Sequence, residues 1–318
     1  MRGAAAPRPR RRLVLVAAAP APAPAWPQSV NNSFPPGHYA AVAASSIKWI
    51  YGAVGAVAVV DPARMLAAAY APVAANWALP LTRALGSNLV MVAGCIGALQ
   101  LFTQAGLAAS PPAEALTLGL LAAAAFRVLH LAMHKPLFNP TFWAADLGLA
   151  LVAALFFAWR TAAAASAKAA APGPTAGMSP LLPGKTALAT AYGLLAILFA
   201  VGGVVLTGAP PTFGDAVLAA PLGAAGAAMR VAFGSGLLFP GAFAAWALKD
   251  GADAGTLAWP PLRALNWALL VASLNRVVVA VTAFQGGVFV AGAPWPVMVA
   301  LHASAAAVAL AGLAAGRK

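Results

Sequence analysis

Charged residues are scarce in this chain, and acidic residues are the scarcest of all. Of its 318 residues only 8% are charged, six are Asp or Glu, and 62% are hydrophobic. A soluble domain carries about 25% charged residues, which cover its surface. The mean hydropathy of +0.85 points the same way. The composition therefore excludes a soluble globular enzyme and predicts an all-α integral membrane protein.

Cysteine is almost absent, because Cys95 is the single thiol of the chain. One thiol excludes an intrachain disulfide and a thiolate metal cluster built from this chain alone. The sequence also lacks a Walker loop, a nucleophile elbow and a glycine-rich dinucleotide motif in a strand-turn-helix context. We therefore predict no catalytic residue, no cofactor and no metal site, and an enzymatic activity is disfavoured.

Acidic residues are missing from the start of the chain, whereas basic ones are concentrated there. Arg2, Arg8 and residues 10–12 supply five positive charges, and the first acidic residue is Asp61. This acid-free stretch, rich in Arg, Ala and Pro, resembles an organelle transit peptide. It predicts a leader at 1–39 and a chloroplast or mitochondrial membrane. The alternative is that these arginines only hold the N-terminus on the positive side of a membrane.

Beyond this leader the basic residues are scattered singly, so no nucleic-acid partner is expected. Long apolar runs dominate instead, and a bilayer core of about 30 Å requires around 20 apolar residues in a helix. Eight runs meet this requirement, at 40–60, 86–108, 113–133, 142–159, 186–207, 231–248, 262–284 and 294–315. Residues 62–82 and 210–229 are apolar but interrupted by prolines, and we expect interfacial or re-entrant segments there. The main partner is then the lipid bilayer, with other membrane subunits as further candidates.

A segment rich in Ala, Pro, Gly and Ser at 161–184 predicts a linker that divides the spans four and four. The chain then has one four-helix module at 40–160 and a second at 185–318. Lys and Arg near helix ends are retained on the cytoplasmic side of a membrane. Seven such residues fall on the side of the two termini and four on the opposite side. Both termini should therefore face the cytosol, or the stroma or matrix of an organelle.

The two modules carry similar residues in the same order. Tyr51 matches Tyr192, Arg83 matches Arg230, Gly86 matches Gly234 and Arg127 matches Arg276. The offsets between these pairs rise steadily along the chain, as small loop insertions after a duplication would produce. Because four helices is an even number, the two copies should have the same orientation in the membrane. The sequence thus predicts two parallel four-helix repeats.

Within one module, an apolar helix with Tyr-Gly is followed by a proline at its exit, then by Arg and Gly-Ser, and then by a helix carrying Arg. This order resembles the DoxX-like group of four-helix membrane proteins, on the residues Tyr51, Gly52, Pro62, Arg83, Gly86 and Arg127. The resemblance implies a compact antiparallel bundle in each half, and it assigns no catalytic residue.

A few polar residues fall where the membrane makes polarity costly. Arg127 and His130 lie near the end of the third span, and Asp146 lies near the start of the fourth at a matching depth. A charge at such a depth costs about 2.5 to 3.5 kcal/mol on insertion scales, which favours pairing of Arg127 with Asp146. The alternative is that Arg127 snorkels to the headgroups. In the second half Arg276 and His302 take similar places, without a carboxylate.

Three functional classes are compatible with these residues. A non-catalytic structural or assembly component needs only the composition and is the favoured interpretation. The alternative is a small-solute or proton-coupled transporter with a polar site at Arg127, His130 and Asp146. A membrane enzyme or redox subunit would use His130 and His134, whose i, i+4 spacing suits a metal but which lack a third ligand nearby. Polar residues of both halves on one cavity would favour transport, and a sealed bundle would favour the structural role.

Overall fold

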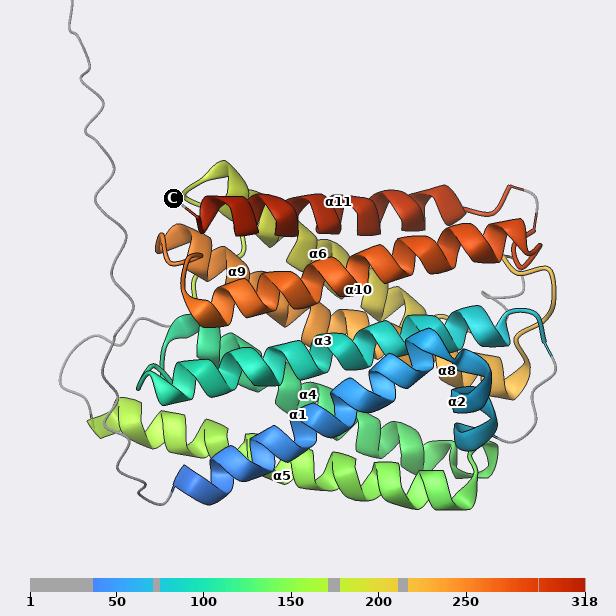
Figure 1. Cartoon of the computed structure of the whole chain (residues 1–318), viewed down its shortest axis with the longest axis horizontal. Helices are drawn as coiled ribbons and strands as arrows, with labels where there is room; N and C mark the ends of the chain where they lie inside the picture. Colours follow the sequence, from blue (N-terminus) through green and yellow to red (C-terminus); the bar gives the residue numbers. More distant parts are fainter. Residues whose placement is uncertain (1–36, 71–74, 171–177, 211–216, 291, 318) are drawn as a thin grey trace, which may run out of the picture.

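The computed structural model describes residues 37–70, 75–170, 178–210, 217–290 and 292–317, which form a bundle of helices (Figure 1). Within these ranges, pairing of β type is limited to two isolated bridges. Eight helical spans are long and apolar enough to cross a membrane. The prediction of an all-α polytopic membrane protein is therefore confirmed. The predicted leader lies outside the described residues except for 37–39, which begin the first helix.

The spanning helices follow one another through short connections. The first half contains α1 (Gly37–Val60), α3 (Ala78–Gln104), α4 (Pro111–Met133) and α5 (Pro140–Ala170), and the second contains α6 (Ala187–Gly208), α8 (Gly223–Gly236), α9 (Ala242–Asp253), α10 (Pro260–Gln285) and α11 (Trp295–Ala315). The short helices α2 (Pro62–Ala69) and η1 (Lys135–Leu137) lie between spans. A π-helical turn, η2 (Leu237–Gly241), joins α8 to α9 into one span around Pro240. Proline has no N–H and clashes with the preceding turn, which the wider π-helical turn accommodates.

Two spanning helices begin earlier than the sequence predicts. The second span starts at Ala78 instead of Gly86, and the sixth starts at Gly223 instead of Val231. Pro80 lies in the first turn of α3, where backbone N–H groups have no partner within the helix, so proline is tolerated there. The expectation of interfacial or re-entrant structure is therefore wrong for residues 78–82 and 223–229, which belong to spanning helices.

The predicted linker is also shorter than expected, because α5 continues through Ala170. Its last turns are rich in alanine, the strongest helix former, which extends the helix beyond the apolar run. Residues 178–184 then fold back on the second half, where Met178 and Leu181 pack against the core. The indole Nε1 of Trp246 donates a hydrogen bond to the Ser179 carbonyl at 2.9 Å.

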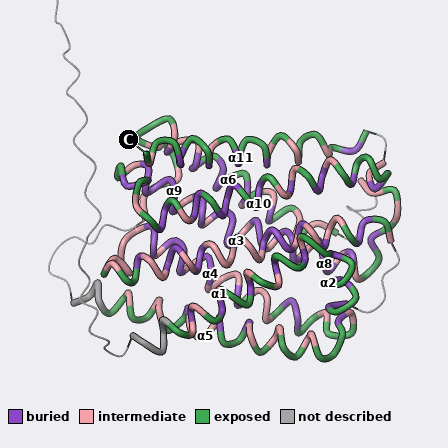
Figure 2. Tube along the Cα trace, in the orientation of Figure 1, coloured by how far each residue is buried: buried purple, intermediate pink, exposed green. Residues whose placement is uncertain are grey.

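The two halves meet along four spanning helices at the centre of the bundle, where α8, η2 and α9 count as one span. The α3 and α10 helices pack along each other, and α4 packs against α8, η2 and α9 (Figure 1). The α5 and α11 helices lie at opposite edges of the bundle, and they expose more of their residues than the central helices do (Figure 2). Each half thus turns its second and third spanning helices toward the other half.

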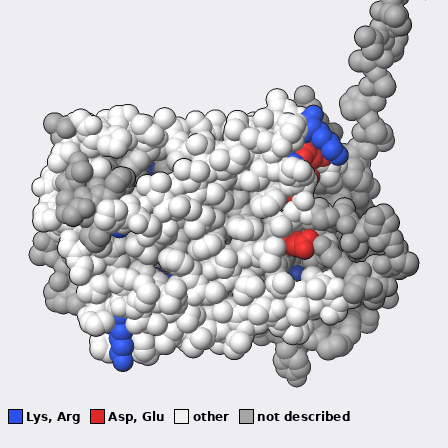
Figure 3. Space-filling view, turned by 180° about the vertical axis from the view of Figure 1, so that it is seen from behind, with Lys and Arg blue, Asp and Glu red and all other residues white. Residues whose placement is uncertain are grey.

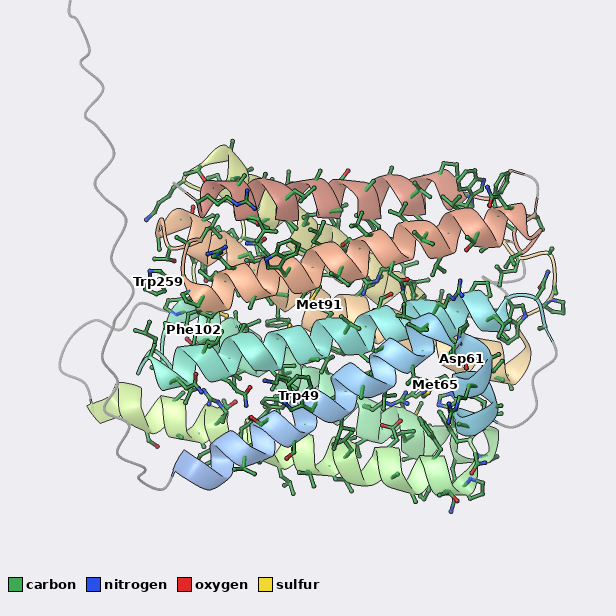
Figure 4. All side chains as sticks on the ribbon, viewed as in Figure 1. Trp49, Asp61, Met65, Met91, Phe102 and Trp259 are labelled. Carbon is green, nitrogen blue, oxygen red and sulfur yellow. The ribbon has the colours of Figure 1, made fainter. Side chains whose placement is uncertain are left out.

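One face of the bundle is uncharged around its middle and charged toward its ends (Figure 3). On the face in Figure 3 the visible charged side chains lie toward the two ends and leave the middle uncharged. The start of α1 and the C-terminal end of α11 lie at the same end (Figure 1). Trp259 and Phe102 lie near that end, whereas Asp61 and Met65 lie near the opposite one (Figure 4). An uncharged band between charged ends suits a chain that crosses a lipid bilayer.

In both halves, the first two spanning helices cross at a pair of glycines. A Cβ on Gly86 would lie 2.8 Å from the carbonyl oxygen of Gly55, and a Cβ on Gly203 would lie 2.8 Å from that of Gly234. Such distances are shorter than a real Cβ allows, so glycine is required for these backbones to approach so closely. The α1–α3 and α6–α8 crossings thus have the same construction.

Candidate functional site

A cavity of about 350 Å³ lies within the first bundle and reaches the second half. Helices α1 to α5 form most of its wall, and residues of α8 and η2 complete it. The lining is mainly apolar, and its polar members are Tyr51, Tyr70, Thr82, Asn88, Arg127, His130, Asp146 and Ser235. Sites for small molecules have volumes of about 300 to 1,000 Å³ and a mainly apolar lining with a few polar groups. This cavity therefore has the size and lining of a site for a small molecule.

Arg127 on α4 and Asp146 on α5 form an ion pair in the cavity wall. The guanidinium donates two hydrogen bonds to Asp146 Oδ2, one from Nη2 and one from Nε at 3.1 Å. Arg127 lies six residues before Met133, and Asp146 lies six residues after Pro140. Each charge is thus about 9 Å from its helix end. The sequence predicted this depth for Arg127 and about four residues for Asp146, because the fourth span was expected to start at residue 142. The two opposite charges cancel, so the pair adds no net charge to the cavity wall. Its side chains are 26% and 11% exposed, so they are not fully buried.

His130 lies one turn beyond Arg127 in the same wall. Its side chain is buried, and neither ring nitrogen has a hydrogen-bond partner among the described residues. The ring packs edge-on against Phe138 with the centroids 6.2 Å apart. His134 Nδ1 lies 2.9 Å from the His130 carbonyl oxygen, which engages that ring with the backbone. Within the described ranges no group of three His, Cys, Asp or Glu side chains could hold a metal, so this histidine pair has no third ligand there.

Tyr70 closes the end of the cavity next to α2. It pairs with Phe138 in an isolated β-bridge, and the two rings lie with centroids 4.9 Å apart. Burial raises the pKa of the Tyr70 phenol to about 12 because the low-dielectric surroundings disfavour the phenolate. The hydroxyl therefore stays protonated at physiological pH and is a neutral hydrogen-bonding group at the cavity.

Asn88 connects the cavity to the second half. Its Nδ2 donates a hydrogen bond to the Phe233 carbonyl of α8 at 3.0 Å, and its Oδ1 accepts one from Nη2 of Arg276 on α10. A Cβ on Gly236 would overlap the Asn88 amide, so the glycine makes room for this side chain. We did not predict a role for Asn88 from the sequence. The available signal was an amide directly after Gly86-Ser87 in an otherwise apolar span.

Arg276 is buried between the halves without a carboxylate partner. Its side chain is 2% exposed, and Nε and Nη1 have no hydrogen-bond partner in the described structure. The guanidinium carbon lies 5.7 Å from the centroid of the Phe233 ring. Next to it, Asn275 Nδ2 donates to Ser87 Oγ of α3 at 2.5 Å. Arg276 is therefore fixed across the interface and does not repeat the ion pair of Arg127.

His302 on α11 is also buried, and its Nδ1 has no partner among the described residues. Its ring lies 6.1 Å from that of Phe199 on α6, between centroids. It does not line the cavity, and no hydrogen bond joins it to Arg276 in the described part of the chain. Of the five polar candidates predicted from the sequence, the cavity thus brings together Arg127, His130 and Asp146.

A second polar cluster lies at the end of α9, where the sequence predicted a loop. Lys249 is 1% exposed, and its Nζ lies 2.6 Å from Asp253 Oδ2 and 2.5 Å from Ser179 Oγ. Ser179 in turn donates to Asp250 Oδ1. Lys249 is therefore a buried, paired residue near the end of α9. The cluster ties residues 178–184 to the second half.

No protein-family model matches this chain, and no curated protein matches it by sequence.

Proposed function

We propose that this polytopic membrane protein is a small-solute transporter whose substrate site is the cavity in the first bundle. The observation that carries the proposal is that both halves line one cavity, the first half with polar residues that include Arg127 and Asp146, and the second half with the single polar residue Ser235. Transporters place their substrate sites deep in the membrane, where their halves meet. Such convergence is the feature that separates a transporter from a sealed structural bundle.

The substrate expected for this cavity is small and amphipathic. The mainly apolar wall suits an apolar body, and the Arg127–Asp146 pair offers donors and acceptors side by side to a polar group. The phenol of Tyr70 adds a neutral hydrogen-bonding group at the same cavity. A volume of about 350 Å³ limits the substrate to a small molecule.

The proposal includes two parallel four-helix repeats of the DoxX-like kind. The glycine pairs Gly55–Gly86 and Gly203–Gly234 support it. Gly203 follows Gly55 by 148 positions, Gly234 follows Gly86 by the same number, and each pair lies where the first two spanning helices of its half cross. The packing of α3 on α10 and of α4 on α9 supports it as well, since a two-fold axis along the membrane normal would exchange these contacts. With an offset of 148, Phe199 is the repeat equivalent of Tyr51, whereas the sequence match had paired Tyr51 with Tyr192.

The leader at 1–39 supports an organellar membrane as part of the same proposal, with the termini on the stromal or matrix side. The structural or assembly role stays a prediction, and a sealed bundle would favour it. The two functions differ in whether water-soluble reagents can reach the cavity. Accessibility of a cavity residue is therefore the experiment that tests the proposal.

We would replace Ser235 with Cys in the Cys95→Ala background, which has no other thiol. The full-length variant is reconstituted into sealed vesicles and treated with the membrane-impermeant reagent sulfonatoethyl methanethiosulfonate, added outside or trapped inside. We expect modification of Ser235→Cys from both sides, measured by intact mass, because a transporter opens its site to each side in turn. The matched control is Ser273→Cys, since Ser273 is 0% exposed and does not line the cavity.

Equal protection of positions 235 and 273 would contradict the proposal and favour the structural role. Modification from one side only would contradict transport, because the site would then never open to the other side.

A further inference from the structure

We infer that the substrate of this cavity is a monoanionic amphipathic molecule, such as a medium-chain carboxylate, with its acidic group at the Asn88 wall in front of Arg276. The inference deepens the proposed function and rests on it. It starts from the charges buried in the middle of the bundle.

The charges buried deep among the described residues do not balance. Asp146 is the one carboxylate deep inside a described span, and Arg127 already binds it. The other described carboxylates, at positions 61, 114, 250 and 253, lie next to helix ends. Lys48 lies within α1, but its Nζ is 5.1 Å from the ring of Trp49, which is 70% exposed, so it reaches toward the outer face. Two buried arginines thus have no carboxylate partner among the described residues: Arg230 on α8, which binds the Ala209 carbonyl through Nη2, and Arg276 on α10. Arg276 is the one that contacts a residue of the cavity wall, Asn88.

Arg276 is also incompletely hydrogen-bonded. It lies nine residues before Gln285, about 13 Å from that end of α10, which is too deep for its head to reach water along the helix. Nη2 binds an amide oxygen, which carries no formal charge, while Nε and Nη1 are buried without a partner among the described residues. A guanidinium offers five N–H donors and binds carboxylates most strongly through parallel pairs of them. Arg276 does not line the cavity itself, so its charge would act on a bound molecule across Asn88.

Asn88 brings this charge to the cavity. The same amide that accepts the hydrogen bond of Arg276 lines the cavity wall. An anionic group against Asn88 would therefore lie one side chain away from the guanidinium. The field of a charge is strong in a low-dielectric interior, so the Arg276 guanidinium, one side chain away, favours an anion over a neutral group. The apolar remainder of the cavity would hold the rest of the molecule.

The test measures binding of octanoate and of neutral octanol to the full-length protein in nanodiscs, using radiolabelled probes. We expect octanoate to bind at least tenfold more tightly than octanol. Arg276→Gln should reduce octanoate affinity to that of octanol and leave octanol binding unchanged. The control Arg263→Gln removes an exposed cation at the start of α10 and should change neither affinity.

A second variant keeps the inference testable if Arg276→Gln fails to fold. Asn88→Asp places a carboxylate on the residue that already contacts Arg276, so it should abolish the preference for octanoate. The change also removes the hydrogen bond that the amide donates to the Phe233 carbonyl, so the readout is probe binding and not stability. Equal affinities of octanoate and octanol in the wild type, or a preference that persists in Asn88→Asp, would overturn the inference.

Failure of the inference and of the proposed function can be told apart with Ala124→Phe. Ala124 lines the cavity, whereas the adjacent Ala125 is exposed on the outside of α4. If Ala124→Phe blocks both probes equally and Ala125→Phe blocks neither, but octanoate has no advantage, only the anionic class is wrong. If neither probe binds the wild type, or Ala124→Phe has no effect, the cavity is not the site and both proposals fail.

Discussion

Replacing Asp146 with Asn should destabilise the fold, because Arg127 would keep its charge inside the bundle without a counterion. At 3.1 Å and an effective dielectric constant of about 20, the pair attracts by about 5 kcal/mol before the cost of desolvating both charges. Breaking a buried pair costs about 3 to 5 kcal/mol in soluble proteins, and interactions between membrane helices are weaker. The two side chains also remain 26% and 11% exposed, which lowers the value further. We therefore expect a loss of about 1 to 3 kcal/mol.

The matched control is Asp61→Asn. Asp61 is exposed and caps α2 by accepting a hydrogen bond from the Arg64 N–H at 3.1 Å. Asn caps helices as well as Asp does, so this variant loses a solvated charge and should change stability by less than about 0.5 kcal/mol. The free energy of unfolding would be measured for both variants by titration with denaturing detergent.

A double-mutant cycle with Arg127→Gln isolates the pair from other effects of each substitution. Removing both charges should cost less than the sum of the single losses, because neither partner is then left alone. We expect a coupling energy of about 1 to 2 kcal/mol. A coupling energy near zero, or equal stability of Asp146→Asn and Asp61→Asn, would show that Arg127 and Asp146 do not stabilise each other.

Two further predictions concern packing at the ends and crossings of the helices. Gly203→Ala should destabilise the protein by about 1 to 3 kcal/mol, because its Cβ would lie 2.6 Å from the Cβ of Leu238, whereas Gly202→Ala meets open space and should be neutral or stabilising by up to about 1 kcal/mol. Thermal melting of the two variants checks this, and equal melting temperatures would count against the close crossing of α6 and α8. Lys249→Met should lower the melting temperature because Asp253 loses its buried partner, while Lys185→Met, which removes an exposed charge, should not. Equal effects at the two lysines would show that the cluster at the end of α9 contributes no stability.

The number and order of spans could be predicted from the sequence because each apolar run exceeds the thickness of a bilayer core. The starts of α3 and α8 could not, since prolines near them were taken as breaks although a first helical turn tolerates proline. The alanine-rich end of α5 was missed for a related reason, because hydropathy does not report helix propensity. Element type was thus predictable from composition, and boundaries depended on local backbone chemistry.

The candidate site was predictable only where two residues lie at the same depth in the membrane on helices that follow each other in the sequence. Arg127 and Asp146 satisfy that condition, and the structure joins them. The contact between Asn88 and Arg276 joins helices of different halves, so it depends on how the halves pack. The space left by Gly236 has the same origin, and so does the cavity itself. Sequence spacing carries no information on packing between distant helices.

Whether the cavity is a substrate site can be seen in a cryo-electron microscopy structure of the full-length protein in nanodiscs, determined with and without octanoate. We expect an open cavity bounded by Tyr51, Arg127 and Asn88, with density for the probe whose carboxylate end faces Asn88. A cavity filled by side chains in both maps, or probe density only on the outside of the bundle, would contradict this expectation.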